Sequence, residues 1–347
     1  MRRKIDALDQ QIVELLNQRS EVSLQVGKVK GPGAPVLAPG REAEVYERAL
    51  TASKGPLPPA ALRAIYGEIL SSSRALQVPL KVAFLGPEHT FGHQAALSFF
   101  GKSTDFVAVA SHPDVFQETE LGRVDYGIVA IENSTEGPVG ATLDSFVDSE
   151  LKACAEVRLE IHQALMSRAS LGDIKTIYSH PQSFGQCRDW LRSHLAGVPL
   201  VEMPSNVAAV KRASEEAGAA ALGPEVAAAP YGLNVLEPRC EDVAGNTTRF
   251  LIIGRQVGER TGRDRMALLF SVKDRVGVLR DVLALFASAG INLTKIESRP
   301  SKRRAWDYVF FVDLDAHPSD PAMAAVLRDL AELTVFVKVL GAWRRAD

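Results

Sequence analysis

The sequence is poor in cysteine and has no long apolar run. Its three cysteines, Cys154, Cys187 and Cys240, are widely separated and form no CxxC pair, so they indicate structural thiols in a reducing compartment. No apolar run approaches the roughly 20 residues of a membrane span. The basic N-terminus leads into a helical pattern and not into the apolar stretch of a signal peptide. We therefore expect a cytoplasmic protein with no membrane partner.

An excess of positive charge is also missing. Lys and Arg number 40 against 42 for Asp and Glu, and the formal net charge is −2. Because attraction to phosphate needs a cationic surplus, this balance argues against a nucleic-acid partner. The polar clusters described below contain no Walker loop, GxGxxG or GxSxG motif. His89 and His93 lie four residues apart without an evident third ligand, so we expect no metal and no cofactor.

What the sequence does contain is three segments of different character, in keeping with its 347 residues. Residues 1–78 have only helical periodicity. Apolar residues spaced three and four apart predict one long helix over residues 1–30, and two further helices follow, from Pro39 to about Ser53 and from Pro58 to about Gln77. Residues 79–255 alternate short apolar runs with helical stretches, which is typical of an α/β domain.

The C-terminal segment, residues 266–347, follows a polar linker at 255–265. Its pattern predicts strands at 267–272, 291–297, 308–314 and 335–340, with helices at 278–288 and 322–333. The order βαββαβ is the ferredoxin-like arrangement. The fold class is therefore a multidomain α and α/β protein.

Arg19 interrupts the apolar series of the first predicted helix. A buried cation needs a carboxylate partner or an anionic ligand. Lys30 lies 11 residues on, about 20° away around the helix, so both cations could address one pocket. Arg2 lies about 100° and roughly 25 Å from Arg19, so it cannot easily serve that pocket within one chain. Alternatively, Arg19 pairs with a carboxylate such as Glu42 or sets coiled-coil register, and Arg2 is a solvated end.

These residues resemble the helical chorismate mutases, through Arg2 to Asp9, Gln18-Arg19-Ser20-Glu21, Val26 to Lys30, and Arg41-Glu42. The resemblance covers about residues 1–78 and implies an intertwined all-helical dimer, in which Arg2 reaches the partner chain's site. It implies a Claisen rearrangement, catalysed by conformational compression and charge stabilisation. Ala38 stands where some members carry an acidic residue. The implied chorismate-binding residues are Arg2, Arg19, Lys30, Arg41, Glu42, Ser73 and Gln77, of which Lys30, Glu42 and Gln77 are expected to be catalytic.

Five polar clusters lie at predicted strand ends in the α/β segment: 86–91, 131–134, 178–183, 204–206 and 245–250. Each alone most simply caps the next helix. Together, and with Thr248-Arg249-Phe250 as the most specific marker, they resemble prephenate dehydratase. The first cluster departs from that family's usual run at Glu88 to Gly92.

The resemblance implies two α/β lobes similar to periplasmic binding proteins, at about 80–158 plus 235–254 and at 159–234. Thr248 is expected to donate a hydrogen bond to the departing hydroxyl. Arg249 could bind a carboxylate or form a structural salt bridge. The implied cleft residues are Thr90, Glu132, Asn133, Ser134, His180, Gln182, Ser205, Asn206, Thr248 and Arg249.

In the C-terminal segment, Gly277-Val278-Leu279 and Glu297-Ser298-Arg299-Pro300 resemble phenylalanine-binding ACT domains. Such domains pair across a dimer and bind phenylalanine between a loop of one subunit and a strand of the other. The implied effector contacts are Gly277, Val278, Leu279, Glu297, Ser298 and Arg299. Alternatively, Glu297 and Arg299 pair on a strand surface and Gly277 only begins a helix.

Taken together, the resemblances imply a bifunctional enzyme of phenylalanine biosynthesis that forms a homodimer or a higher homo-oligomer. It would convert chorismate to prephenate, and prephenate to phenylpyruvate with loss of water and CO2, under feedback inhibition by L-phenylalanine. One alternative is a dehydratase of prephenate or arogenate whose helices only dimerise. Another is a solute-binding or amino-acid sensor protein without catalysis.

Overall fold

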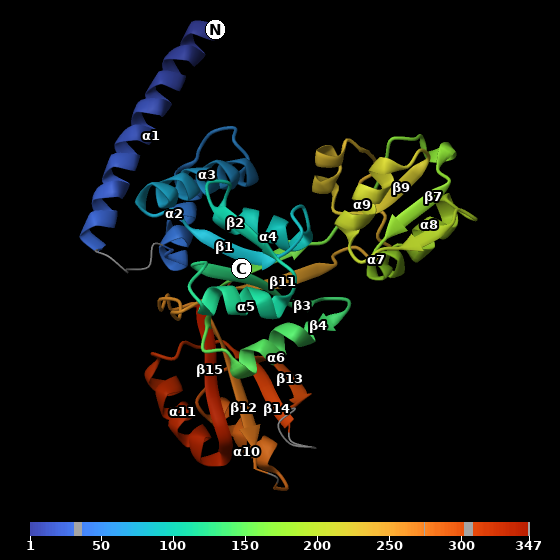
Figure 1. Cartoon of the computed structure of the whole chain (residues 1–347). Helices are drawn as coiled ribbons and strands as arrows, with labels where there is room; N and C mark the ends of the chain where they lie inside the picture. Colours follow the sequence, from blue (N-terminus) through green and yellow to red (C-terminus); the bar gives the residue numbers. More distant parts are fainter. Residues whose placement is uncertain (31–36, 274, 302–307, 346–347) are drawn as a thin grey trace.

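The computed structural model describes residues 1–30, 37–273, 275–301 and 308–345. Its N-terminal part consists of three helices: α1 (Arg2–Lys30), α2 (Pro39–Ala52) and α3 (Pro59–Gln77). Proline occupies the first turn of α2 and of α3, where its missing N–H is not needed. Helix α3 packs against both α1 and α2. The N-terminal half of α1 projects away from the body of the molecule (Figure 1).

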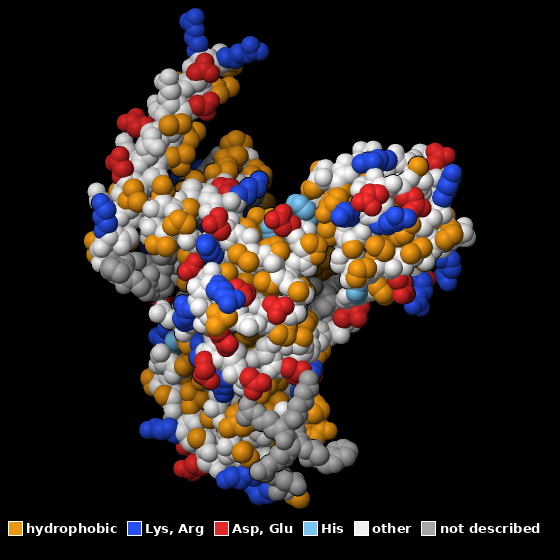
Figure 2. Space-filling model, viewed as in Figure 1, with side chains coloured by type: hydrophobic (Ala, Val, Ile, Leu, Met, Phe, Trp, Pro, Cys, Tyr) orange, Lys and Arg blue, Asp and Glu red, His pale blue; other side chains and the backbone are white. Residues whose placement is uncertain are grey.

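The apolar stripe of α1 is uncovered over most of its length. The predicted seam residues Ile5, Leu8, Ile12, Leu15 and Val22 are each more than half exposed. In Figure 2, apolar side chains run along the flank of this projecting helix. The predicted helical periodicity is therefore confirmed, but the described part of the chain does not supply a surface that covers the stripe.

A mixed sheet forms the first lobe of the α/β region. β1 (Lys81–Leu85) runs parallel to β2 (Asp105–Val109) and to β3 (Tyr126–Asn133), while β11 (Thr247–Gly254) runs antiparallel to β3 and β5 (Lys152–Glu160). The short β4 (Gly137–Pro138) pairs with β3. The helices of this lobe are α4 (Phe91–Phe100), α5 (His112–Glu120) and α6 (Gly140–Asp148). Val82, Ala83 and Phe84 are fully buried, which explains the continuous apolar run of β1.

The second lobe has a separate five-stranded sheet in the order β10-β6-β9-β7-β8. Its strands are β6 (Ala164–Ser167), β7 (Thr176–Ser179), β8 (Leu200–Glu202), β9 (Ala219–Gly223) and β10 (Asn234–Glu237). Its helices are α7 (Pro181–Gln186), α8 (Arg188–His194), α9 (Asn206–Glu215) and the short 3-10 turns Leu171–Asp173, Glu225–Ala227 and Ala229–Tyr231. The chain crosses between the lobes twice, and backbone hydrogen bonds from Ile161 to Asn246 and from Cys240 to Gln163 tie the crossings together.

The C-terminal domain has the predicted βαββαβ order. Its elements are β12 (Asp264–Val272), α10 (Val278–Ser288), β13 (Leu293–Pro300), β14 (Tyr308–Leu314), α11 (Pro321–Leu333) and β15 (Thr334–Arg344). The strands lie in the antiparallel order β13-β14-β12-β15, so β13 is an edge strand. β15 continues four residues beyond the predicted end at Leu340.

This longer β15 joins the C-terminal sheet to the sheet of the first lobe. Gly341 of β15 pairs with Ala153 of β5, and the two sheets continue into one another through this bridge. A Cβ on Gly341 would lie 2.1 Å from the carbonyl oxygen of Ala153, so only glycine permits the approach. One apolar core contains Phe146 of α6 together with Phe311 and Trp343 of the C-terminal domain. The domain is therefore packed on the first lobe.

Within the described residues, no helix is long and apolar enough to span a bilayer. The same residues contain no group of three or more His, Cys, Asp or Glu side chains arranged to hold a metal ion. The three cysteines are buried and unpaired with one another. Burial raises the pKa of the Cys154 thiol to about 12, as expected for a structural thiol.

Candidate active sites

Three helices enclose a hollow of about 470 Å³ in the N-terminal region, here called the helical hollow. It contains five of the seven side chains predicted to bind chorismate: Arg19, Arg41, Glu42, Ser73 and Gln77. The remaining lining residues are Val22, Ser23, Val26, Ala38, Val45, Leu70 and Arg74. These residues come from α1, α2 and α3. The two that lie farthest apart in the sequence, Arg19 and Gln77, are separated by 58 positions.

Hydrogen bonds fix several of these side chains. Arg19 donates from Nη1 to Ser73 Oγ, and Gln77 donates from Nε2 to Ser23 Oγ over 2.7 Å. Among the described residues, no carboxylate lies within ion-pair distance of Arg19. The alternative in which Arg19 pairs with Glu42 is therefore not what the structure shows. Its charge is available to an anion in the helical hollow.

The other two predicted chorismate-binding residues are not placed in the helical hollow. Arg2 begins α1 at the far tip of the projecting helix (Figure 1), as its separation from Arg19 predicted. Lys30 ends α1, and its side chain lies outside the described part of the structure. Arg41 lines the hollow but also pairs with Glu44 at 2.6 Å on the surface.

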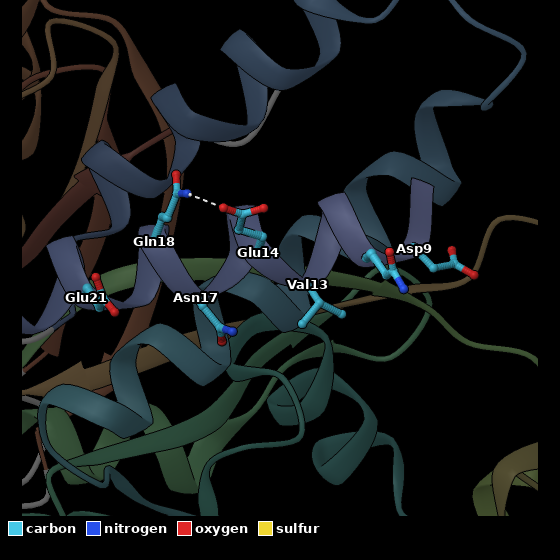
Figure 3. A pocket seen from close by; sticks show the side chains of 7 residues that line it. Asp9, Val13, Glu14, Asn17, Gln18 and Glu21 are labelled. Atoms are coloured by element: carbon cyan, nitrogen blue, oxygen red, sulfur yellow. Dashed lines mark hydrogen bonds between the residues drawn. The ribbon is translucent and has the colours of Figure 1, made fainter. Parts of the chain in front are cut away.

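A second, open hollow lies beside the projecting half of α1. Figure 3 shows its side chains, and all of its lining residues belong to this one helix: Asp9, Gln10, Val13, Glu14, Asn17, Gln18 and Glu21. The one hydrogen bond drawn there joins Gln18 to Glu14. Because α1 alone lines this groove, any opposite wall must come from another molecule.

In the first lobe, Thr248 lies opposite Asn133 in the β11–β3 pair. Asn133 Oδ1 accepts from the backbone N–H groups of Thr135 and Glu136, both at 3.0 Å, which orients the amide. Asn133 Nδ2 then donates to Thr248 Oγ1 at 2.8 Å. Since the threonine oxygen already accepts this bond, its own proton is available to a ligand. This is the arrangement needed for a hydroxyl that donates to a leaving oxygen.

Asn246 extends this network; it belongs to the 245–250 cluster but was not among the implied cleft residues. Its Oδ1 accepts from Asn133 Nδ2 at 2.8 Å and from Thr135 Oγ1 at 2.9 Å, and only 4% of the residue is exposed. Ser134 links the end of β3 to the start of β11, since its Oγ accepts a hydrogen bond from the backbone N–H of Thr247. Asn246 precedes Thr248 by two positions, so the two-residue period of a strand could have identified it.

A hollow of about 440 Å³ bridges the two lobes next to this network, here called the interlobe hollow. Thr135 and Asn246 line it from the first lobe side, and Gln186 and Arg188 line it from the second lobe. The hollow as a whole is acidic, because Glu136, Asp189, Glu241 and Asp242 line it too, and Arg188 is the one cation among its lining residues. It was not predicted from the sequence, because it follows the 178–183 cluster and belongs to no motif.

The predicted residues of the second lobe mainly organise strand ends. Asn206 Oδ1 accepts from Ser179 Oγ, from the backbone N–H of His180 and from Ser183 Oγ, at 3.0 to 3.3 Å. Ser205 Oγ caps α9, and His180 Nδ1 accepts from the backbone N–H of Gln182. No hydrogen bond between described residues joins this group to Thr248. The structure therefore keeps these second-lobe residues apart from the Asn133–Thr248 network.

Thr90 has a similar local role in the first lobe. Its Oγ1 accepts from the backbone N–H of His93 at 3.3 Å and so caps α4. His89 adopts a positive φ of 67°, and its backbone N–H donates to His93 Nδ1. Burial lowers the pKa of His93 despite the opposing effect of Glu88. Residues 88–92, which differ from the usual prephenate dehydratase sequence, therefore lie in a turn that is held by hydrogen bonds between neighbouring residues.

Glu132 and Arg249 are placed differently from the prediction. Adjacent strand residues point to opposite faces, so these two register partners face away from the Asn133–Thr248 side. Arg249 bonds Glu156 at 2.8 Å and Asp313 of β14 at 2.5 Å, and Glu132 pairs with Lys295 of β13 at 2.8 Å. Burial opposes the charged guanidinium, but Asp313 and Glu156 outweigh it and raise the pKa of Arg249. Arg249 therefore forms the structural salt bridge that the sequence left as an alternative.

The predicted effector contacts divide between two places in the C-terminal domain. Gly277 begins α10 with a φ of 80°, a conformation that favours glycine, followed by Val278 and Leu279. Glu297 and Arg299 share one face of β13 and Ser298 lies on the other. Arg299 pairs with Asp144 of α6 at 3.2 Å and is thus directed to the first lobe. The alternative of a Glu297–Arg299 surface pair is not observed.

Comparison with known proteins assigns each region to a family. Residues 1–78 match chorismate mutase type II, residues 82–257 match prephenate dehydratase, and residues 266–332 match the ACT domain. A bifunctional chorismate mutase/prephenate dehydratase of Aquifex aeolicus is 43% identical, covering 100% of this chain and 97% of that protein. The Pseudomonas aeruginosa enzyme is 42% identical with the same coverage. The chain belongs to the bifunctional chorismate mutase/prephenate dehydratases.

Solved structures of prephenate dehydratases agree with this assignment. The prephenate dehydratase of Arthrobacter aurescens in complex with L-Phe is 32% identical with a TM-score of 0.72, over 77% of this chain and 91% of that chain. The Staphylococcus aureus prephenate dehydratase is 29% identical with a TM-score of 0.68, over 76% and 100%. The chain is thus a chorismate mutase and prephenate dehydratase of phenylalanine biosynthesis. The alternatives of a sensor or of a dehydratase with inactive helices do not describe it.

Proposed function

We propose that the chorismate mutase site is the helical hollow, completed by Arg2 from a second copy of this chain. Arg19 and Arg41 supply the positive charge that the two carboxylates of chorismate require. Gln77, together with Lys30, contacts the ether oxygen and stabilises the charge that grows there as the C–O bond breaks. Arg2 cannot reach the hollow from its own chain, because it lies at the tip of α1.

The proposed second copy is a homodimer partner that covers α1. The described residues leave the apolar stripe from Ile5 to Val22 exposed, and this stripe needs an opposing helix. A long apolar seam of this kind is typical of helix pairing. The dimer is thus part of the catalytic mechanism, because it brings Arg2 to the site.

We further propose that Thr248 assists loss of the ring hydroxyl from prephenate. The C–O bond breaks, the bond from the ring to its carboxylate breaks to release CO2, and those electrons make the ring aromatic. The departing hydroxide takes up one proton and leaves as water. Thr248 donates the hydrogen bond to this oxygen, and Asn133 orients Thr248 by donating to Oγ1.

The substrate carboxylates are proposed to bind near the interlobe hollow. Arg188 is the one cation of a lining that also carries Glu136, Asp189, Glu241 and Asp242, so it is the group proposed to face a substrate carboxylate. The network of Asn246 and Asn133 connects the hollow to Thr248. In the second lobe, local hydrogen bonds are proposed to stabilise the strand ends that face the hollow. They involve Ser205, Asn206, His180 and Gln182.

Asn133→Ala tests the proposed dehydratase site. Without Asn133 the Thr248 hydroxyl is no longer held in place, and misplacing it is expected to lower kcat on prephenate by about 10²-fold. Conversion of chorismate to prephenate should stay unchanged. Ser134→Ala is the matched control, because Ser134 bonds the neighbouring backbone and not Thr248. A dehydration rate in Asn133→Ala equal to that of the control would remove Asn133 from the mechanism.

Feedback inhibition by L-phenylalanine is proposed to act through β13. The effector would bind between the Gly277 loop of one subunit and Glu297 to Arg299 of another, and the relative from Arthrobacter aurescens was solved with L-Phe bound. The same strand carries Lys295, which pairs with Glu132 beside Asn133, and Arg299, which pairs with Asp144. A shift of β13 would therefore reach both the catalytic strand β3 and helix α6.

Inhibition of the purified chain tests this route. Phenylpyruvate formation from chorismate alone should fall when L-phenylalanine is added. In Lys295→Met, the L-phenylalanine concentration for half inhibition should rise while phenylalanine still binds, because the contact to Glu132 is lost. Unchanged inhibition in this variant would show that the coupling does not use Lys295.

A further inference from the structure

Arg74 is a buried arginine of the helical hollow that no sequence motif singled out. It follows Ser73 in α3 and is 5% exposed. Its Nη1 donates to Glu42 Oε1 at 2.6 Å, and its Nη2 donates to the backbone carbonyl of Phe100 at 2.6 Å. Its Nε is buried and has no hydrogen-bond partner among the described residues. One guanidinium therefore holds a pocket carboxylate and a carbonyl from another domain.

Phe100 gives this contact a rigid anchor in the dehydratase domain. It is the last residue of α4, where carbonyl groups lack partners within the helix and carry partial negative charge. Its ring is fully buried in the core beneath β1. Next to it, Ser71 Oγ accepts from the backbone N–H of Ser103, and a Cβ on Gly101 would lie 2.5 Å from Ser71. The junction between α3 and α4 is thus closely packed.

We propose that Arg74 is a positioning residue of the chorismate mutase reaction, which fixes Glu42 against the dehydratase domain. The proposal rests on the proposed placement of the mutase site in the helical hollow. The Glu42 side chain is only 15% exposed, so without Arg74 it would lose its charge partner in a poorly hydrated place. The geometry of the mutase site would then depend on contact with the second enzyme domain.

The mutase reaction is sensitive to such positioning. It involves no proton transfer and no covalent intermediate, so its rate depends on how well the site holds the reactive conformer. A misplaced pocket residue can cost about 100-fold in rate. Dehydration of prephenate at Thr248 does not use Glu42 and provides an internal control for folding.

The test uses the full-length chain. Arg74→Gln keeps a donor for the Phe100 carbonyl but removes the charge that Glu42 binds, and is expected to lower mutase kcat roughly 10- to 100-fold. KM for chorismate should change less, and the rate on prephenate should remain that of the wild type. Arg74→Lys should recover part of kcat. Ser71→Ala loosens the same junction without touching the helical hollow and should leave mutase kcat unchanged.

A double-mutant cycle separates positioning from general support. In a Glu42→Gln background, Arg74→Gln should cause little further loss, because the residue through which it acts is already altered. If the fold loss in mutase kcat of the double variant equalled the product of the two single losses, the inference would be overturned. Equal mutase kinetics in Arg74→Gln and Ser71→Ala would overturn it as well. If Glu42→Gln itself retained wild-type mutase activity, the proposed site would be wrong as well. A slow Glu42→Gln with a wild-type Arg74→Gln would contradict the role of Arg74 alone.

Discussion

Replacing Arg249 by methionine is expected to weaken the joint between the dehydratase and ACT domains. The guanidinium lies between Glu156 and Asp313, whose side chains are 1% and 11% exposed. Methionine fills a similar volume but leaves both carboxylates without this cation. Removing one partner of a buried ion pair costs about 3–5 kcal/mol. For a cooperative unit of about 150–250 residues, this corresponds to a fall in Tm of roughly 6–20 °C.

The loss should depend on pH, with a sign that follows from Glu156. Burial works against its charged form, but the attraction of Arg249 and Arg158 outweighs burial and holds the pKa of Glu156 below its ordinary value. A lowered pKa adds stability above the unfolded pKa, and this stability is lost as the pH falls through the folded pKa. Without Arg249, less attraction opposes the effect of burial, so the pKa of Glu156 should be higher than in the wild type. The difference between wild type and variant should therefore be largest near pH 7 and shrink toward about pH 4.

Thermal unfolding of the full chain at several pH values measures this difference. Arg158→Met is the matched control, because Arg158 also contacts Glu156 at 2.8 Å but is 45% exposed. Arg158 keeps much of its hydration, and Glu156 still pairs with the buried Arg249 in this variant, so the control should lose less. Equal losses in the two variants, or a loss in Arg249→Met that does not vary with pH, would refute the reasoning.

Two further changes address the domain joint and the dimer. Gly341→Ala should separate β15 from Ala153, lowering Tm and weakening inhibition by L-phenylalanine, while Gly172→Ala, which meets no atom within 4 Å, should do neither. The opposite ranking of these two variants in calorimetry would argue against a close sheet-to-sheet contact. Leu8→Lys combined with Ile12→Lys should give monomers by sedimentation that lack mutase activity but still dehydrate prephenate. A monomeric wild type with full mutase activity would contradict the need for a second copy.

Local patterns predicted most of the secondary structure, because each element has its own signal. The helix predicted at 278–288 and the strand predicted at 308–314 have the observed bounds, since their apolar periods are regular and a glycine or proline lies nearby. The spacing of Arg2 and Arg19 also predicted correctly that one chain cannot bring both to one pocket. These inferences needed no knowledge of distant contacts.

Contacts between domains could not be predicted in the same way. β15 extends past Leu340 because Gly341 meets Ala153, almost 190 positions earlier, and no local pattern contains that pairing. The orientation of Glu132 and Arg249 could have been predicted from the sequence. Alternate strand residues face opposite sides of a sheet, and Thr248 was already assigned to the cleft. The contacts of Arg74 could not have been predicted from the sequence, since its partner Phe100 belongs to another domain.

The most direct test of two active sites in one chain is the fate of chorismate in Thr248→Val. Valine keeps the shape of threonine but cannot donate to the leaving hydroxyl, so phenylpyruvate formation should fall by at least about 100-fold. The mutase site is untouched, and prephenate should accumulate at the wild-type rate. Chromatographic measurement of chorismate, prephenate and phenylpyruvate over time follows both steps. Phenylpyruvate at the wild-type rate, or chorismate left unconverted, would contradict the account.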